Sequence, residues 1–379
     1  MRLLRDHVRP GRRVEPSRVP VPDAPRSPRR GVFSLAGKPF ALATWRSVGE
    51  LCEVDRDAEG VNRIDPARVQ CYWYNSNRPS PHRLKENGTV PLSFIVLDQN
   101  RMRSGETISS ALDRCCRENV RLLIPDGAGF EFSKGSDPHL NWTRSLQLIA
   151  PFAELVVVGR KISHVWNEEI LQGVPSIDVV DDGGTTRFRE LLRQIEAGDA
   201  TGLRQIIDGP GWSSMEASLD NWSHHEQFKA MIKTFRDALQ PSLTEATVKD
   251  LRTNSDDAIA RWLESVDGMS FVFQGIQSRG VKAEAALGLA ARPSVIGAFI
   301  SGMAALALYW IAFGGLESAK PEIITNDIVD LEYGVIGALS DSLLTSDRRL
   351  KAIHHAIKRG LDGRARWFAR ALELGPDAA

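Results

Sequence analysis

Hydrophobic runs and helical repeats alternate where the ordered pattern of this chain begins. The run at 92–97 is apolar and rich in β-branched residues, and polar residues follow it directly, which predicts a buried strand. Residues 108–119 repeat with helical spacing, and the run at 120–125 predicts a second strand. Residues 127–134 predict a turn into a helix that carries Glu131. The pattern is therefore β-α-β-α.

From about residue 145 to 320 the pattern becomes mainly helical. Apolar positions recur on one helical face at 188–195 and again at 228–239. Two shorter apolar runs, at 155–158 and 177–180, predict further strands. We therefore expect a helical segment with little sheet.

The α/β pattern returns near the C-terminal end. Residues 327–339 predict a helix, residues 341–345 predict a short strand that leads to Asp347, and a basic helix is expected from Arg348 onward. Acidic residues again follow a strand end, as they do at Asp98. In open α/β sheets, ligands bind in the crevice at the carboxyl ends of the strands.

The first 92 residues predict no regular element. The first 30 contain nine arginines, three acids and six prolines, a mixture that neither buries apolar surface nor sustains a helix. The arm could contact RNA phosphates through its positive charge, or it could be a solvated tail.

Residues 293–316 contain no charged side chain and are long enough to cross a membrane. A helix that is apolar on all sides also occurs in the core of a large soluble domain. A membrane span would have to leave Glu131 and Asp330 on one side, so we favour the core helix and keep a membrane-anchored protein as an alternative.

Composition narrows the possible partners. The 379 residues include 42% hydrophobic residues, enough for a sizeable core, and 48 basic residues balance 48 acidic ones. No global field attracts nucleic acid, so such binding must be local. The four cysteines form no CxxC pair, and no apolar signal segment follows Met1, so we expect a cytoplasmic protein.

Four short motifs resemble the PIN and PIN-like nuclease superfamily. The first strand ends in Asp98-Gln99-Asn100, similar to the family's Asp-Thr-Asn, and Ile124-Pro125 precedes a helix with Glu131. Asn326-Asp327-Ile328-Val329-Asp330 and Thr345-Ser346-Asp347 are similar to the family's closing motifs. The resemblance implies an α/β fold, a PIN-like three-layer domain with a central, mostly parallel sheet.

The same resemblance divides the chain. Residues 93–145 and 321–379 would form the two halves of the nuclease domain, residues 146–320 would form a mainly helical insertion, and residues 1–92 would precede them unstructured.

The resemblance also implies roles for the acids. Asp98, Asp330 and Asp347 would bind the metal, and Glu131 would complete the catalytic set by orienting water or a second ion. Supporting roles would fall to Asn100, Asp327 and Thr345.

Elementary electrostatics supports the grouping. Clustered carboxylates repel one another and need a cation or shared protons. Mg²⁺ or Mn²⁺ suits oxygen ligands, and a water on such an ion can attack phosphorus without a nucleophilic side chain. Any single acid, Asp327 above all, could instead be a helix cap or a surface residue.

The basic helix beside these acids could hold a nucleic-acid backbone through Arg348, Arg349 and Lys351, or it could simply be solvated. The predicted function is a metal-dependent ribonuclease that hydrolyses phosphodiester bonds of RNA. The main alternative is a non-catalytic PIN-like scaffold whose helical insertion binds a partner protein.

Overall fold

The computed structural model of the chain describes residues 93–102, 105–118, 120–133, 137–176, 178–209, 222–340 and 342–374. The region 1–92, which the sequence predicts to be unstructured, lies outside these residues.

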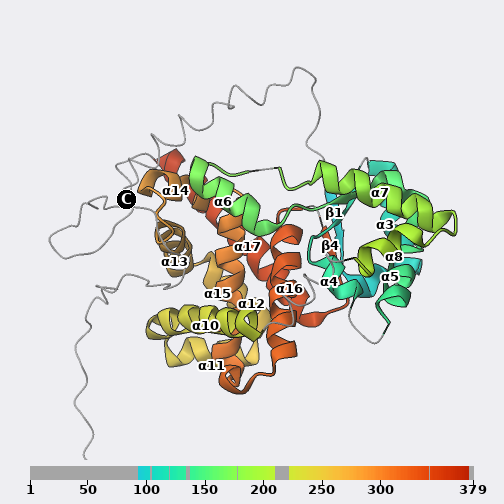
Figure 1. Cartoon of the computed structure of the whole chain (residues 1–379). Coiled ribbons are helices and arrows are strands. Elements are labelled where there is room, and N and C mark those ends of the chain that lie inside the picture. Colours follow the sequence, from blue (N-terminus) through green and yellow to red (C-terminus); the bar gives the residue numbers. More distant parts are fainter. Residues whose placement is uncertain are drawn as a thin grey trace, which may run out of the picture. The chain divides into compact units, whose positions relative to one another are not determined.

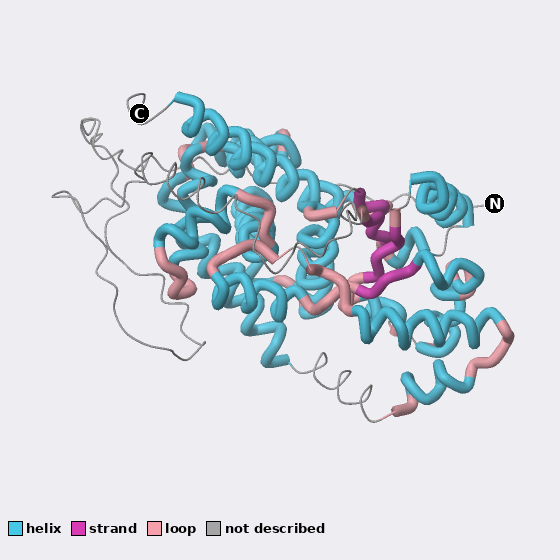
Figure 2. The backbone as a smooth tube through the Cα atoms, turned by 90° about the horizontal axis from the view of Figure 1, so that it is seen from above, coloured by secondary structure: helices cyan, strands magenta, loops and turns pink. Residues whose placement is uncertain are grey.

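Four short strands form one parallel sheet. They are β1 (Phe94–Leu97), β2 (Arg121–Ile124), β3 (Val156–Val158) and β4 (Ser342–Leu344), in the order β3-β2-β1-β4. Val96 of β1 lies opposite Leu123 of β2 and Leu343 of β4. Because all three strand pairs are parallel, the four carboxyl ends meet at one edge. Figure 2 shows the strands gathered in one place, and Figure 1 labels β4 next to β1, its partner, although the two are far apart in sequence.

One predicted strand is absent from the described part. Around 177–180 the structure shows only an isolated antiparallel bridge between Val180 and Gly159, and residue 177 is not described. Two residues that pair at a single point do not make a strand, so this prediction was wrong.

The helices that accompany the sheet include those predicted between its strands. In order they are α2 (Gln99–Met102), α3 (Gly105–Glu118), α4 (Ala128–Phe132), α5 (Pro138–Leu146), the 3-10 helix η1 (Ala150–Leu155), α7 (Asp182–Glu196) and α8 (Thr201–Ile207). Helix α6 (Ile162–Gln172) comes before α7 in sequence but packs in the helical part of the chain. In Figure 1 the sheet lies between α3 and α16 (Pro321–Ala338).

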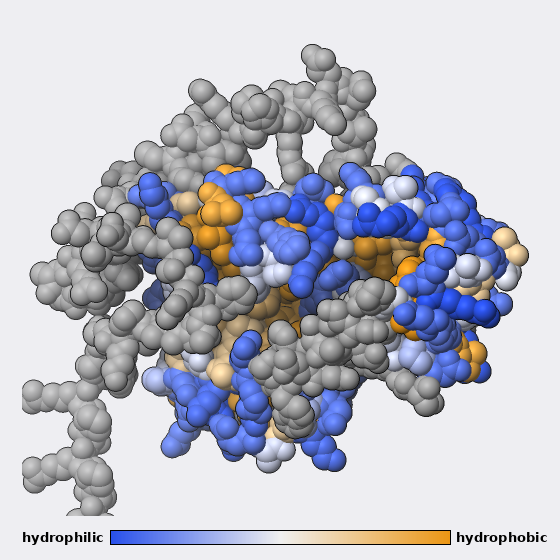
Figure 3. Space-filling model, in the orientation of Figure 1, coloured by the Kyte–Doolittle hydropathy of each residue, from blue (hydrophilic) through white to orange (hydrophobic). Residues whose placement is uncertain are grey.

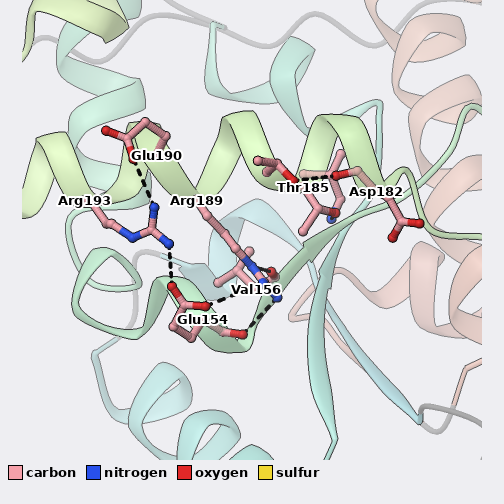
Figure 4. A network of polar contacts seen from close by, with 9 residues as sticks. Glu154, Val156, Asp182, Thr185, Arg189, Glu190 and Arg193 are labelled. Atoms are coloured by element: carbon pink, nitrogen blue, oxygen red, sulfur yellow. Dashed lines mark hydrogen bonds and ion pairs between the residues drawn. The ribbon is translucent and has the colours of Figure 1, made fainter.

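Helix α7 is fastened to the sheet by arginine side chains (Figure 4). Arg189 donates through Nε to the carbonyl of Val156 at 2.9 Å and through Nη2 to that of Glu154 at 2.9 Å. Arg193 pairs with the Glu154 carboxylate at 2.6 Å. The hydroxyl of Thr185 accepts from the backbone N–H at the end of β3 at 2.9 Å.

These contacts change the predicted domain boundary. Apolar side chains of β3, α7 and α8 belong to the same hydrophobic cluster as the strands β1 and β2. The α/β part therefore continues well past residue 145, where the sequence predicted that the helical insertion begins.

The other described residues form helices and their connections, apart from β4. Their elements are α10 (Trp222–Leu239), η2 (Gln240–Ser242), α11 (Glu245–Thr253), α12 (Ser255–Glu264), α13 (Val266–Gln277), α14 (Ala283–Ala291), α15 (Val295–Phe313), η3 (Leu316–Ser318), α16 and α17 (Arg348–Leu374). The described residues thus form a mixed α/β structure that is mostly helical.

Helix α15 is the apolar segment that the sequence singled out. Within the described residues it is the one helix long and apolar enough to cross a membrane. All its residues except Tyr309, Ile311 and Phe313 are buried, because α6, α10 to α13, α16 and α17 surround it. In Figure 3 the visible surfaces of α7 and α11 are mostly hydrophilic. Here α15 is packed as a core helix.

Helix α16 connects the two hydrophobic clusters of the described structure. Val335 packs into the cluster around α15, whereas Tyr333 packs into the cluster under the sheet. Gly337 permits a close approach to β4, since a β-carbon there would lie 2.9 Å from Cβ of Leu343. The helix that carries two of the predicted acids is therefore held from both sides.

Candidate metal centre

Asp98 and Asp347 follow neighbouring strands at the carboxyl edge of the sheet. The backbone N–H of Asp98 donates to the carbonyl of Leu344 at 3.1 Å, which continues the ladder between β1 and β4. The hydroxyl of Thr345 donates to Oδ2 of Asp98 at 2.7 Å and accepts from the backbone N–H of Asp347 at 2.9 Å. Thr345 therefore ties together two motifs that the sequence places far apart.

Glu131 reaches the same edge from helix α4, which follows β2. The side chain of Gln99 donates through Nε2 to the backbone carbonyl of Glu131 at 2.7 Å and so anchors α4 at the end of β1. Burial raises the pKa of the nearby Tyr333 phenol well above its usual value, and the charges of Glu131 and Asp98 raise that pKa further. Both carboxylates therefore lie close to the phenol.

Asp330 supplies the fourth carboxylate, from α16. Burial raises its pKa to about 8, and the charges of Asp347, Glu131 and Asp327 act in the same direction, whereas Arg349 lowers it. Asp330 therefore senses acids from the end of β4 and from α4. The charges of acids on three elements thus act on one another near the carboxyl edge of the sheet.

The acids also differ in their access to solvent. Asp98 is buried, Glu131 and Asp330 are partly buried, and Asp347 is exposed. The site therefore runs from the interior to the surface at the sheet edge, and a dissolved substrate can reach its outer end.

The donor set suits a small divalent cation in its chemistry. Carboxylate oxygens are the ligands that Mg²⁺ takes, and Mg²⁺ retains several waters and needs only one or two direct carboxylates. In the described part of the chain, no three His, Cys, Asp or Glu side chains already surround one common point as a metal-binding group. Water would therefore have to complete the coordination of an ion.

Asp347 also has a structural task. Its Oδ1 accepts from the backbone N–H of Leu350 at 2.9 Å, so it caps the N-terminal end of α17. This leaves Oδ2 as the oxygen that the cap does not use. The cap holds the carboxylate in a defined orientation next to the strand end.

Asp327 and Arg349 form a buried pair instead of facing a ligand. The fully buried Asp327 pairs with Arg349 at 2.8 Å, and the indole of Trp310 donates to Oδ2 of Asp327 at 3.1 Å. Burial raises the pKa of Asp327 to about 6, although Arg349 opposes this. The Arg349 guanidinium also lies over the rings of Tyr309 at 4.4 Å and Trp310 at 5.3 Å.

This arrangement corrects one predicted contact. Arg349 was expected to bind a nucleic-acid backbone, but its guanidinium is already bonded to a carboxylate and stacked on two aromatic rings. Arg348 and Lys351 are exposed and keep that prediction open. The side chain of Asn100 lies outside the described residues, so its predicted supporting role is not addressed.

The sequence did not single out Glu332 and Asp126. Burial and the charge of Asp126 raise the pKa of Glu332 to about 8, and the charge of Lys161 opposes this rise. A β-carbon at Gly127 would overlap Oε2 of Glu332, so the glycine leaves room for this carboxylate. Asp126 follows β2, and the same strand-end rule that found Asp98 could have found it. No local pattern identifies Glu332.

Comparison with models of protein families, with curated proteins and with solved structures gives no match. The PIN-like resemblance therefore depends on the four motifs of this sequence alone.

Proposed function

We propose that this chain is a PIN-like, Mg²⁺- or Mn²⁺-dependent nuclease that hydrolyses phosphodiester bonds of RNA. Two observations support the proposal: the Thr345 hydroxyl bonds both Asp98 and the backbone of Asp347 at the carboxyl edge of the sheet, and the charges of Asp347 and Glu131 help to raise the pKa of Asp330 to about 8. Such a cluster is unfavourable without a cation, and a divalent ion would relieve the repulsion.

Each of these residues would have its own role in the reaction. Asp98, Asp330 and Asp347 would hold the ion, and the Thr345 hydroxyl fixes the orientation of Asp98. Glu131 would orient the attacking water from α4. The ion, when bound, supplies charge neutralisation at the phosphate oxygens and lowers the pKa of a coordinated water.

The choice of RNA comes from the family resemblance and from local charge. Arg348 and Lys351 lie exposed in the first turn of α17, directly after Asp347, and offer cations to the phosphates of a bound strand. The formal charge of the whole chain is zero, so these local cations would have to provide the attraction.

The test uses the full-length protein, single-stranded RNA and Mn²⁺. Changes of residues that merely support metal ligands lower metal affinity or activity about 10–100-fold, so Asp98→Asn and Asp330→Asn should each lower cleavage by about 100-fold or more. The matched control is Asp362→Asn, which removes an exposed carboxylate from α17 and should cleave like the parent. Thermal melting of each variant shows that it is folded.

The rival function is a non-catalytic scaffold, which the lack of a preformed three-ligand group among the described residues favours. Titration calorimetry with Mn²⁺ separates the two. A scaffold need not bind the ion at these acids. Cleavage that is unchanged in both asparagine variants would remove the nuclease assignment.

A further inference from the structure

A cleft of about 480 Å³ opens beside the acidic site. Its lining residues are Arg101, Thr107, Ser110, Leu343, Leu344, Thr345 and Lys351, which come from α2, α3, β4 and α17. Pockets that hold small ligands measure about 300–1,000 Å³, so the volume suits a ligand of that size. One of the lining residues, Thr345, is the residue whose hydroxyl donates to Asp98.

The lining combines positive charge with hydroxyl groups. Arg101 and Lys351 provide two cations, and three of the other lining residues carry hydroxyls. Arg101 donates through Nη1 to the hydroxyl of Thr107 at 3.4 Å, a long hydrogen bond. Among the described lining residues, none has an acidic side chain. This combination recognises phosphate oxygens through charge-assisted hydrogen bonds.

The floor of the cleft is apolar. Leu343 and Leu344 of β4 line it, and β4 is the outermost strand of the sheet, so no described strand covers its far side. Apolar surface in the same cleft as two cations suits a sugar or base that accompanies a phosphate. A free inorganic anion would not need it.

The cleft borders the acids through two of its lining residues. Thr345 lines it and donates to Asp98, and Lys351 lies one helical turn after Asp347, whose carbonyl accepts from the Lys351 backbone N–H at 3.1 Å. A strand whose backbone lies in the cleft would therefore pass directly to the proposed cleavage site.

We infer that this cleft binds the phosphate backbone of single-stranded nucleic acid next to the bond to be cut, with Arg101 and Lys351 as its two phosphate contacts. The inference deepens the proposed nuclease function and rests on it for the identity of the ligand. It adds Arg101, Thr107 and Ser110 to the substrate-binding residues.

The test measures binding apart from cleavage. A fluorescein-labelled 12-nucleotide oligouridine RNA is titrated by fluorescence anisotropy against full-length Asp98→Asn protein at several salt concentrations. Each phosphate contact to a single strand contributes about 0.7 to the slope of log affinity against log salt, so the added pair Arg101→Ala/Lys351→Ala should reduce the slope by about 1.4. Extrapolated over one decade from 1 M, that slope corresponds to roughly 25-fold weaker binding at 0.1 M salt.

Two controls keep the result specific. The pair Arg204→Ala/Lys249→Ala removes one arginine and one lysine that are exposed on α8 and α11, and should leave affinity and slope unchanged. Ser110→Asp places a negative charge in the cleft at an exposed position and should weaken binding.

The outcomes are distinguishable from those of the nuclease test. Equal affinity and slope in the cleft pair and the control pair would overturn the cleft, and so would a parent that binds no RNA. If the cleft pair loses binding and the control pair does not, the cleft is supported, even where the unsubstituted protein shows no metal-dependent cleavage. That second result would refute only the nuclease proposal.

Discussion

At the scale of single residues, Thr345 connects the end of β1 to the segment that follows β4. It is buried, donates to Oδ2 of Asp98 and accepts from the backbone N–H of Asp347, so one hydroxyl positions both carboxylates. The ends of β1 and β4 are adjacent, so the Thr345 hydroxyl reaches Asp98 directly. Its loss should affect the site more than the fold.

Substitution of Thr345 tests this role. Thr345→Val keeps the shape and removes both hydrogen bonds, so cleavage and Mn²⁺ affinity should fall about 10–100-fold, as for other groups that orient metal ligands. Thr345→Ser keeps the hydroxyl and should retain most of the activity. Cleavage rates and Mn²⁺ calorimetry on both variants decide the question, and equal losses in valine and serine variants would show that the hydroxyl is unimportant.

At the scale of elements, the strand ends place the site. The apolar runs predicted β1 and β2, and the polar residues after them predicted the edge where ligands bind. β4 was also predicted, because its short apolar core leads into Thr345 and Asp347. The positions of these strands could be predicted from the sequence, because each depends on the local hydrophobic pattern.

The remainder depends on contacts between distant elements. No local pattern predicted that α7 would join the sheet through Arg189, because that interaction requires β3 to lie beside α7. Likewise, no local pattern predicted that Arg349 of α17 would turn inward, since its partner Asp327 is on α16. A basic run predicts a solvated face by default.

Helix α17 provides a prediction about the dual role of Asp347. Asparagine is as good an N-cap as aspartate, so Asp347→Asn should keep stability and lose activity, whereas Asp347→Ala should lose activity and also about 1 kcal/mol of stability. The control is Thr244→Ala, which removes the cap of α11, where the Thr244 hydroxyl accepts from the backbone N–H of Thr247 at 3.1 Å. Thr244→Ala should lose about as much stability as Asp347→Ala but keep its cleavage activity.

Chemical denaturation and cleavage assays on the three variants provide the measurements. If Asp347→Asn retained full cleavage activity, Asp347 would be a cap alone.

At the scale of the whole described structure, Arg349 joins the helical core to the site. Its guanidinium pairs with Asp327 of α16 and stacks on Tyr309 and Trp310 of α15, while its own backbone belongs to α17. Three helices therefore meet at one side chain, and its charge also lowers the pKa of Asp330. The acids are held in position by the helical part as well as by the sheet.

Replacement of Arg349 should therefore reduce stability. Removal of one partner of a buried ion pair costs about 3–5 kcal/mol, and since the Arg349 side chain is 22% exposed, we expect Arg349→Gln to cost about 3 kcal/mol. Lysine cannot reproduce the bidentate, stacked geometry, so Arg349→Lys should also be destabilised although it keeps the charge. The measurements are urea denaturation and the salt dependence of RNA binding. A stable Arg349→Gln protein with a reduced salt slope would restore the predicted phosphate contact.

Glu169 connects α6 to the N-terminal end of α15 and provides a pH-dependent test of that connection. Its fully buried carboxylate on α6 accepts from the backbone N–H groups of Val295 at 2.9 Å and Ile296 at 2.8 Å, at the N-terminal end of α15. Burial raises the pKa of Glu169 from 4.5 to about 7, although the backbone hydrogen bonds lower it.

Between these two values the folded protein holds a proton that the unfolded chain has released, so stability falls as pH rises from about 4.5 to about 7 and then levels off. A shift of this size corresponds to about 3 kcal/mol, at 1.36 kcal/mol for each unit of pKa. Glu169→Gln cannot ionise, so the difference in unfolding free energy between parent and variant should change by about that amount over this interval. The measurement is urea denaturation at pH 5, 6, 7 and 8. A constant difference between the two proteins would show that Glu169 is ionised throughout, held by the hydrogen bonds from α15 more strongly than burial opposes it.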